Sequence, residues 1–203
     1  MKKVFLFDLD STITREEILP TIAEEIGKGE EMRFLTESAM MGDMPFEESF
    51  RARVKILSDI PVSKVVSRVK KIKLNSGLVD FIKKNRDICY VVTGNLDIWI
   101  DGLMTDLNME DRVFCSQASV KDDKISKIEN ILKKEESVEK FDGIKVVAIG
   151  DGSNDYAFLK KADIGIGFGG VRKIAPNLLE VCNYAVYTEE KLCELLELIK
   201  EQL

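Results

Sequence analysis

The sequence contains no histidine, and this absence excludes several classes of enzyme. A Ser-His-Asp hydrolase, an H-E-x-x-H metalloprotease and a phosphohistidine enzyme all need an imidazole at the reacting centre. Proton transfer and metal binding must therefore depend on carboxylates, lysines, hydroxyls or thiols. Cysteine is also scarce. The four cysteines lie far apart and form no C-x-x-C pair, so we expect reduced, buried thiols.

Long apolar runs and an excess of basic residues are missing as well. No run approaches the roughly 18 residues of a membrane span, and the four apolar residues before Asp8 are too few for a signal-peptide core. The net charge is −6, from 30 basic and 36 acidic residues, which disfavours a nucleic-acid partner. We expect a cytoplasmic globular protein with a small-molecule partner, no nucleic acid and no membrane, and leave its oligomeric state open.

Short apolar runs rich in β-branched residues alternate with helical patterns, which is typical of a parallel sheet covered by helices. The expected strands are residues 4–8, 88–93, 112–115, 146–150 and 164–168, with a weaker one at 184–187. The expected helices are residues 77–84, 96–108, 127–135, 154–161 and 189–201. This pattern predicts an α/β fold, a Rossmann-like open parallel sheet with helices on both faces.

One interval breaks the alternation, because residues 16–73 read as entirely helical and are far longer than a simple crossover. We interpret this interval as an inserted helical cap. The expected division is a catalytic core of residues 1–14 and 74–203 and a cap of residues 15–73. Ligands of open α/β sheets bind at the carboxyl ends of the strands, so the cap should cover the active site as a lid.

Two acidic clusters follow expected strands. The first strand runs into Asp8 and Asp10, which can share a cation and divide the work of nucleophile and proton donor. A capping aspartate followed by a turn is the alternative explanation. The second cluster is Gly-Asp-Gly-Ser-Asn-Asp at residues 150–155, where Asp151 and Asp155 are spaced to point toward one place. Oxygen-rich clusters of this kind suit Mg²⁺.

Groups that could bind a phosphoryl oxygen lie near two further elements. Thr93 and Gly94 follow a strand and offer a hydroxyl and an accessible backbone N–H. Lys127 follows Ser126 in a pattern typical of a helix start, where anions bind. Lys124 is the competing lysine. It lies in Lys-Asp-Asp-Lys at residues 121–124, which we interpret as a hairpin turn.

Together these motifs resemble the haloacid dehalogenase superfamily of aspartate-nucleophile phosphohydrolases, over nearly the whole chain. The resemblance depends on D-x-D-S-T at residues 8–12 and G-D-G-x-N-D at residues 150–155. It implies a Mg²⁺-dependent phosphatase in which Asp8 forms an aspartyl phosphate and Asp10 acts as acid and then as base. The other implied roles are phosphoryl binding by Thr93, Gly94 and Lys127, metal binding by Asp151, Asp8 and the backbone carbonyl of Asp10, and orientation of loop and metal shell by Asn154 and Asp155.

The insert resembles the cap of phosphoserine phosphatases, with matching residues Glu17, Met40, Phe46 and Arg53. The resemblance implies that Arg53 binds the substrate carboxylate, that Glu17 binds the ammonium and that Met40 and Phe46 close the pocket. Surface charge and cap core are the alternative explanation for these residues. Asn95 stands where the family usually has glycine and adds bulk at the pocket mouth, so substrate preference could differ. O-phospho-L-serine is the expected substrate, in serine biosynthesis, and another small phosphorylated metabolite is the alternative.

Two other interpretations remain. A receiver-type phosphoacceptor would use similar residues without turnover, but such modules lack a large helical insert, and a catalytically silent binding module would leave catalytic positions unfilled. Residues 165–170 match G-x-G-x-x-G, yet the first glycine lies inside the last major strand instead of opening a helix. We expect this segment to be a glycine-rich exit loop that lets the backbone pass close to the active site.

Overall fold

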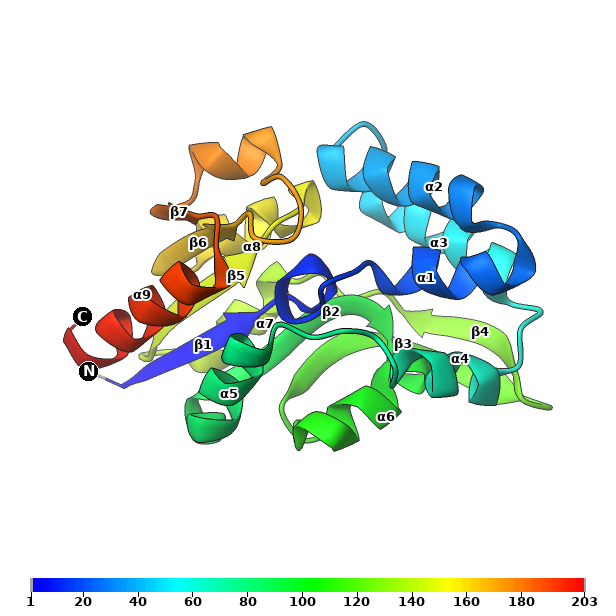
Figure 1. The fold of residues 1–203 in the computed structure, drawn as a ribbon, viewed down its shortest axis with the longest axis horizontal. Helices are drawn as coiled ribbons and strands as arrows, with labels where there is room; N and C mark the ends of the chain where they lie inside the picture. The colour runs from blue at the N-terminus through cyan, green and yellow to red at the C-terminus, as the bar shows by residue number, and fades with distance from the viewer. Residues whose placement is uncertain (1, 203) are drawn as a thin grey trace.

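Seven strands form one sheet through the centre of the computed structural model, which describes residues 2–202 (Figure 1). The strands are β1 (Lys3–Phe7), β2 (Cys89–Leu96), β3 (Val113–Lys121), β4 (Lys124–Asn130), β5 (Lys145–Gly150), β6 (Ile164–Phe168) and β7 (Tyr184–Val186). Their order is β4-β3-β2-β1-β5-β6-β7, and only the β3–β4 pair is antiparallel. The expected open, mostly parallel sheet is confirmed.

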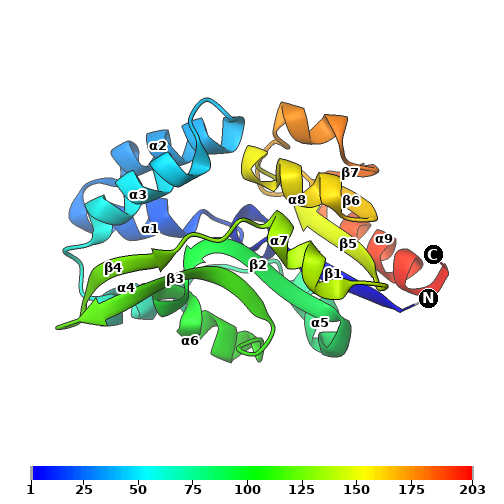
Figure 2. The same cartoon turned by 180° about the vertical axis from the view of Figure 1, so that it is seen from behind.

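Helices cover both faces of the sheet because side chains alternate along each strand. On β1, Phe5 and Phe7 belong to one apolar core, and Val4 and Leu6 belong to the other. The first face is covered by α5 (Ser76–Lys84), α6 (Asp97–Leu107) and α9 (Glu189–Gln202), and the second by α7 (Glu135–Val138) and α8 (Tyr156–Lys161) (Figure 2). Each fully buried large side chain contributes about 1.5–3 kcal/mol to folding.

The expected insert consists of α1 (Ile18–Ala23), α2 (Gly29–Met41), α3 (Phe46–Leu57) and α4 (Val62–Val69). The chain enters and leaves it side by side, since Arg15 N donates to Lys73 O at 2.8 Å and Thr14 pairs with Leu74. Helices α1, α2 and α3 lie beyond the carboxyl end of β1, whereas α4 packs against α6 (Figure 1). The division into residues 1–14 with 74–203 and residues 15–73 stays a prediction.

The helix expected at residues 127–135 is wrong. The chain instead continues as β4 to Asn130, pairs with β3 through the hairpin turn expected at residues 121–124, and begins its next helix only at Glu135. Asp122 and Asp123 both have positive φ, 51° and 58°, as a tight two-residue hairpin requires. Within the described residues, no helix is long and apolar enough to cross a membrane.

Candidate active site

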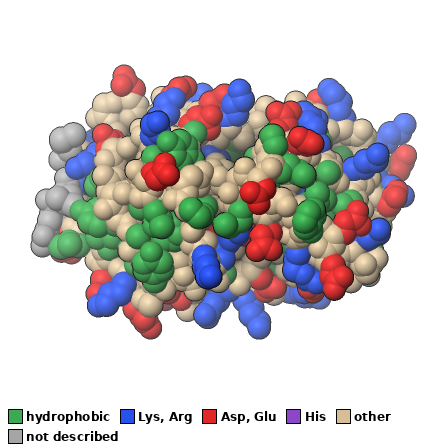
Figure 3. Space-filling view, turned by 90° about the horizontal axis from the view of Figure 1, so that it is seen from above, with side chains coloured by type: hydrophobic (Ala, Val, Ile, Leu, Met, Phe, Trp, Pro, Cys, Tyr) green, Lys and Arg blue, Asp and Glu red, His purple; other side chains and the backbone are tan. Residues whose placement is uncertain are grey.

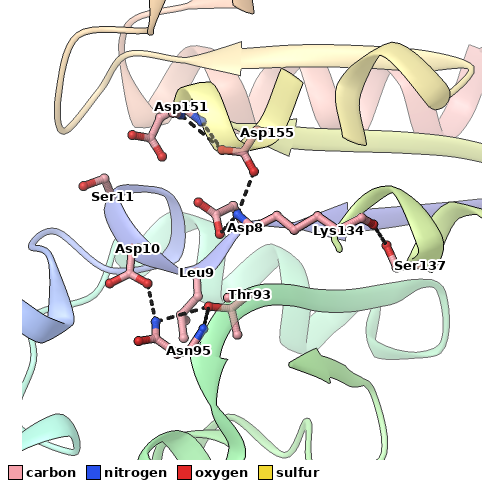
Figure 4. A network of polar contacts seen from close by, with 12 residues as sticks. Asp8, Leu9, Asp10, Ser11, Thr93, Asn95, Lys134, Ser137, Asp151 and Asp155 are labelled. Atoms are coloured by element: carbon pink, nitrogen blue, oxygen red, sulfur yellow. Dashed lines mark hydrogen bonds and ion pairs between the residues drawn. The ribbon is translucent and has the colours of Figure 1, made fainter. Parts of the chain in front are cut away.

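The two aspartate motifs meet at one edge of the sheet because β1 and β5 are parallel neighbours (Figure 4). Asp8 follows β1, and its amide continues the ladder by donating to Ile149 O at 2.9 Å. Asp151 directly follows β5, and its amide donates to Asp155 Oδ2 at 3.2 Å. Ser11 takes a positive φ of 54° inside the short turn after Asp8, which carries the chain away toward the insert. Adjacent carboxyl strand ends therefore place buried carboxylates side by side.

The lysine at this centre is Lys134, which the sequence analysis did not single out. It is the residue before α7, and its ammonium lies 2.5 Å from an oxygen of Asp8 and 2.6 Å from an oxygen of Asp155. Its side chain is only 4% exposed. Burial alone would lower the pKa of Lys134, but Asp155 and Asp8 outweigh it and raise the pKa, so the lysine is a permanent cation here.

The structure corrects the choice of Lys127. That residue lies on β4, is exposed, and pairs with Glu129 on its own strand at 2.6 Å. The competitor Lys124 is also remote from the cluster and lies 3.7 Å from Asp59. Both lysine side chains are exposed to solvent on this hairpin, and neither contacts the buried carboxylates at the strand ends.

Three buried carboxylates form a group that fits a cation. Asp8, Asp151 and Asp155 each offer an oxygen within 4.8 Å of the others. Burial raises the pKa of Asp8 and of Asp151, and the neighbouring carboxylates add to the effect. One oxygen of Asp151 is buried without a hydrogen bond. Lys134 and Arg172 offset part of the charge of these three carboxylates, and a hard divalent cation, which prefers oxygen ligands, would offset the rest.

Asp10 lies outside this group of three. One of its oxygens accepts a hydrogen bond from Ile18 N at 2.8 Å, and the other accepts one from the Asn95 amide. Burial, followed by repulsion from Glu17, raises the pKa of Asp10 from 3.8 to about 7. A carboxyl that titrates near neutrality can donate and accept a proton in turn. The expected metal contact of Asp10 through its backbone carbonyl stays a prediction.

The end of β2 supplies the third side of the site. Thr93 is buried, and its hydroxyl oxygen accepts hydrogen bonds from the backbone and side chain of Asn95 at 3.1 and 3.2 Å. Gly94 faces the insert so closely that a Cβ there would overlap the ring of Phe46. A glycine is therefore required where the insert meets the core.

The insert contributes a buried cation with an unused donor. Arg53 is 3% exposed, and its Nη1 donates to the Thr36 hydroxyl at 3.3 Å. Its Nη2 is buried and has no hydrogen-bond partner. The guanidinium lies 5.6 Å from the centre of the Phe46 ring and 5.8 Å from that of Phe50. A buried guanidinium with a free donor is suited to bind an anionic group.

Core and insert enclose a cavity of about 20 Å³, room for little more than one water molecule. Met40 closes it against Gly152, where a Cβ would overlap the Met40 sulfur. Substrate entry therefore requires the insert to move. The lining residues are Asp8, Asp10, Glu17, Leu19, Met40, Phe46, Phe50, Arg53, Gly94, Asn95, Lys134, Asp151 and Asn154.

The family model for haloacid dehalogenase-like hydrolases matches residues 5–160. The chain is a haloacid dehalogenase-like hydrolase. It is 38% identical over 181 residues to phosphoserine phosphatase of Methanocaldococcus jannaschii, covering 82% of this chain and 85% of that relative. A solved phospho-aspartyl intermediate analogue of phosphoserine phosphatase superposes with a TM-score of 0.81 at 33% identity, and a substrate-bound phosphoserine phosphatase complex with 0.82 at 35%. Both cover 98% of each chain.

The expected family and the expected phosphatase activity are confirmed by these similarities. In this hydrolase, the predicted site residues of the insert and those at the strand ends line the same cavity. Thr93 and Asp155, which were also predicted, do not line it. Three lining residues were missed: Leu19 and Phe50, which are apolar like the rest of the insert's core, and Lys134. A signal for Lys134 exists, because it directly precedes the helix that begins at Glu135.

Proposed function

We propose that this phosphatase hydrolyses O-phospho-L-serine to L-serine and phosphate. The observation that supports this substrate is the buried Arg53 donor without a partner, enclosed in one small cavity with Asp8 and Glu17. The free guanidinium would bind the substrate carboxylate, and Glu17 would bind its ammonium. Met40 and Phe46 line this cavity and would close over the bound substrate.

The reaction would proceed in two steps at the strand ends. An oxygen of Asp8 forms a bond to phosphorus as the bond to the serine oxygen breaks, and Asp10 donates the proton that the leaving oxygen needs. Asp10, now a carboxylate held by Ile18 N and Asn95, then takes a proton from the water that cleaves the aspartyl phosphate. A carboxyl with a pKa of about 7 can do both near neutral pH.

Charge neutralisation would come from Lys134 and a divalent cation. We propose Mg²⁺, held by Asp8, Asp151 and the Asp10 carbonyl, with Asp155 fixed nearby by Lys134 and by the amides of residues 151 and 152. When bound, Mg²⁺ would offset the charge of the transferring phosphoryl group. Thr93, Gly94 and Lys134 would hold the phosphoryl oxygens, and Asn154, whose Oδ1 is buried without a partner, would orient the loop.

We also propose that the enzyme binds only a small-molecule substrate, that it is located in the cytoplasm and that it acts in serine biosynthesis. The four cysteines are all free thiols, in keeping with a reducing compartment. The face seen in Figure 3 carries basic and acidic side chains interspersed, without the broad basic field that a nucleic-acid partner would need.

The test is phosphate release from phosphoserine, with p-nitrophenyl phosphate as a substrate that lacks both the carboxylate and the ammonium. We expect Arg53→Met to raise KM for phosphoserine by about 30- to 100-fold and to leave p-nitrophenyl phosphate nearly unaffected. The matched control is Arg51→Met, because Arg51 lies on the same helix but is exposed and pairs with Glu47. An equal loss on both substrates would contradict carboxylate binding by Arg53, and a single stoichiometric phosphorylation without turnover would favour a receiver-like protein.

A further inference from the structure

The glycine-rich segment after β6 leads into a strap, residues 169–177, that crosses the loop of residues 150–155. Ala175 N donates to Asp151 O at 2.9 Å, and Asn177 Nδ2 donates to the Ser153 hydroxyl at 2.6 Å. The strap can turn this sharply because Gly170 leaves room for the Phe168 ring, which a Cβ would overlap. The segment thus places the next side chains against the active-site loop, beside the insert (Figure 1).

Arg172, on this strap, contacts one acid of the core and one of the expected insert. Its Nε lies 3.4 Å from Asp151 Oδ2, and its Nη1 lies 3.4 Å from Glu17 Oε1. The side chain is 20% exposed and, with Glu17, lines a neighbouring surface groove. Two separate nitrogens of one planar guanidinium are used, one for each acid.

The contact with Arg172 also helps to fix the orientation of the Glu17 carboxylate. Its Oε1 accepts a hydrogen bond from the Ser11 hydroxyl at 2.8 Å and pairs with Arg172. Among the described residues, no hydrogen bond is formed to its Oε2. A carboxylate held through one oxygen offers the other in a fixed direction, which suits a substrate ammonium.

We propose that Arg172 is a positioning residue that joins the insert to the core in the closed state and fixes Glu17 for a substrate ammonium. The part that concerns substrate rests on the proposed phosphoserine activity, whereas the bridge itself does not. Arg172 acts through Glu17 and need not contact the substrate. The strap therefore determines how strongly the enzyme prefers an amino-acid phosphate ester over one without an amine.

The bridge is tested by hydrogen exchange of the metal-free protein, which needs no substrate. In Arg172→Met, we expect amides of residues 17–21 to exchange about three- to tenfold faster than in the unmodified protein, with α5 and α9 unchanged. Lys173→Met is the matched control, because Lys173 is an exposed neighbour with no ion pair among the described residues. Equal exchange at residues 17–21 in Arg172→Met and the unmodified protein would overturn the bridge.

The positioning role is tested by a double-mutant cycle. Arg172→Met should raise the KM for phosphoserine severalfold with little change in kcat, and Arg172→Lys should restore only part of the loss. In a Glu17→Gln background, Arg172→Met should add nothing. On 3-phosphooxypropanoate, which is phosphoserine without its amine, the effect should disappear.

Two outcomes would overturn this role: the same KM increase in the Glu17→Gln background, or the same increase on the substrate without an amine. If the unmodified enzyme does not hydrolyse phosphoserine, the proposed function fails while the hydrogen-exchange result still decides the bridge. If it hydrolyses phosphoserine and Arg172→Met shows no change in KM, the positioning role fails alone.

Discussion

Replacing Lys134 by methionine should destabilise the metal-free protein and abolish its activity. The lysine side chain is 4% exposed, and it is the close partner of two carboxylates that are 6% and 0% exposed. Removing one member of a buried ion pair typically costs about 3–5 kcal/mol, because the remaining charge has lost both water and partner. Asp155 keeps two backbone N–H donors at 3.1 and 3.2 Å, so the loss should lie near 3 kcal/mol.

The free energy of unfolding can be measured by urea denaturation with a chelator present. The chain has a single tryptophan, Trp99, which is 1% exposed in α6 and therefore reports unfolding of the core. Lys127→Met is the matched control, because that lysine is 69% exposed and, among the described residues, forms an ion pair with Glu129 alone. We expect a change below about 0.5 kcal/mol for this control.

Phosphate release should separate the same two variants. Lys134→Met loses the cation that faces both the nucleophile and the phosphoryl group, so we expect a fall in kcat of about a thousandfold or more. Lys127→Met should retain its activity. If Lys127→Met were the inactive variant, or if the two variants lost equal stability, the assignment of Lys134 as the counter-ion of Asp8 would be refuted.

Three further outcomes are expected. Gly94→Ala should raise KM at least tenfold by keeping the insert from closing. Adding Phe46→Leu should restore part of the loss, and if it does not, the contact between Gly94 and Phe46 is not the cause. Glu189→Gln should cost about 1 kcal/mol in urea denaturation, since Glu189 accepts from the first amides of α5 at 2.5 and 3.3 Å, whereas exposed Glu190→Gln should cost nothing. Burial raises the pKa of Asp10 to about 7 from 3.8, so the folded state retains a proton that the unfolded state loses between about pH 4 and 7. Metal-free protein should therefore lose stability as pH rises through that window, and Mg²⁺ should stabilise it more at pH 8 than at pH 5; a flat profile would contradict the shift.

The fold could be predicted from the sequence where an apolar run of strand length is followed directly by polar, chemically reactive residues. Four of the expected strands, residues 4–8, 88–93, 146–150 and 164–168, are buried on both faces or nearly so, and such runs are recognisable without any contact information. The carboxyl ends of parallel neighbours lie together by topology, so Asp8 and Asp151 could be placed in one site from their positions in sequence. The sequence did not predict the distances between the site residues, the closed state of the insert or the bridge made by Arg172. These features depend on packing between segments far apart in the chain.

The expected helix at residues 127–135 failed for a local reason. Ile125, Ile128 and Ile131 recur every three residues, which imitates one face of a helix. In the structure, Val120 faces Ile125 while Ala118 faces Ile128, so β4 has three steps where β3 has two. The register shifts again before Asn130. Each extra residue is a β-bulge that turns the next isoleucine back to the same face.

The wrong choice of Lys127 as the phosphate-binding lysine follows directly from the wrong helix prediction. A helix beginning at Ser126 puts Lys127 in its first turn and Lys134 in its last, where an ammonium would face the wrong end of the helix for an anion. Once the hairpin is recognised as continuing through Asn130, the next helix must begin near Glu135, and the lysines before it move to the position that binds anions. Of Lys133 and Lys134, the structure turns the second inward between Asp8 and Asp155. The chemistry required one lysine near the nucleophile, and the error lay in the helix expected at residues 127–135.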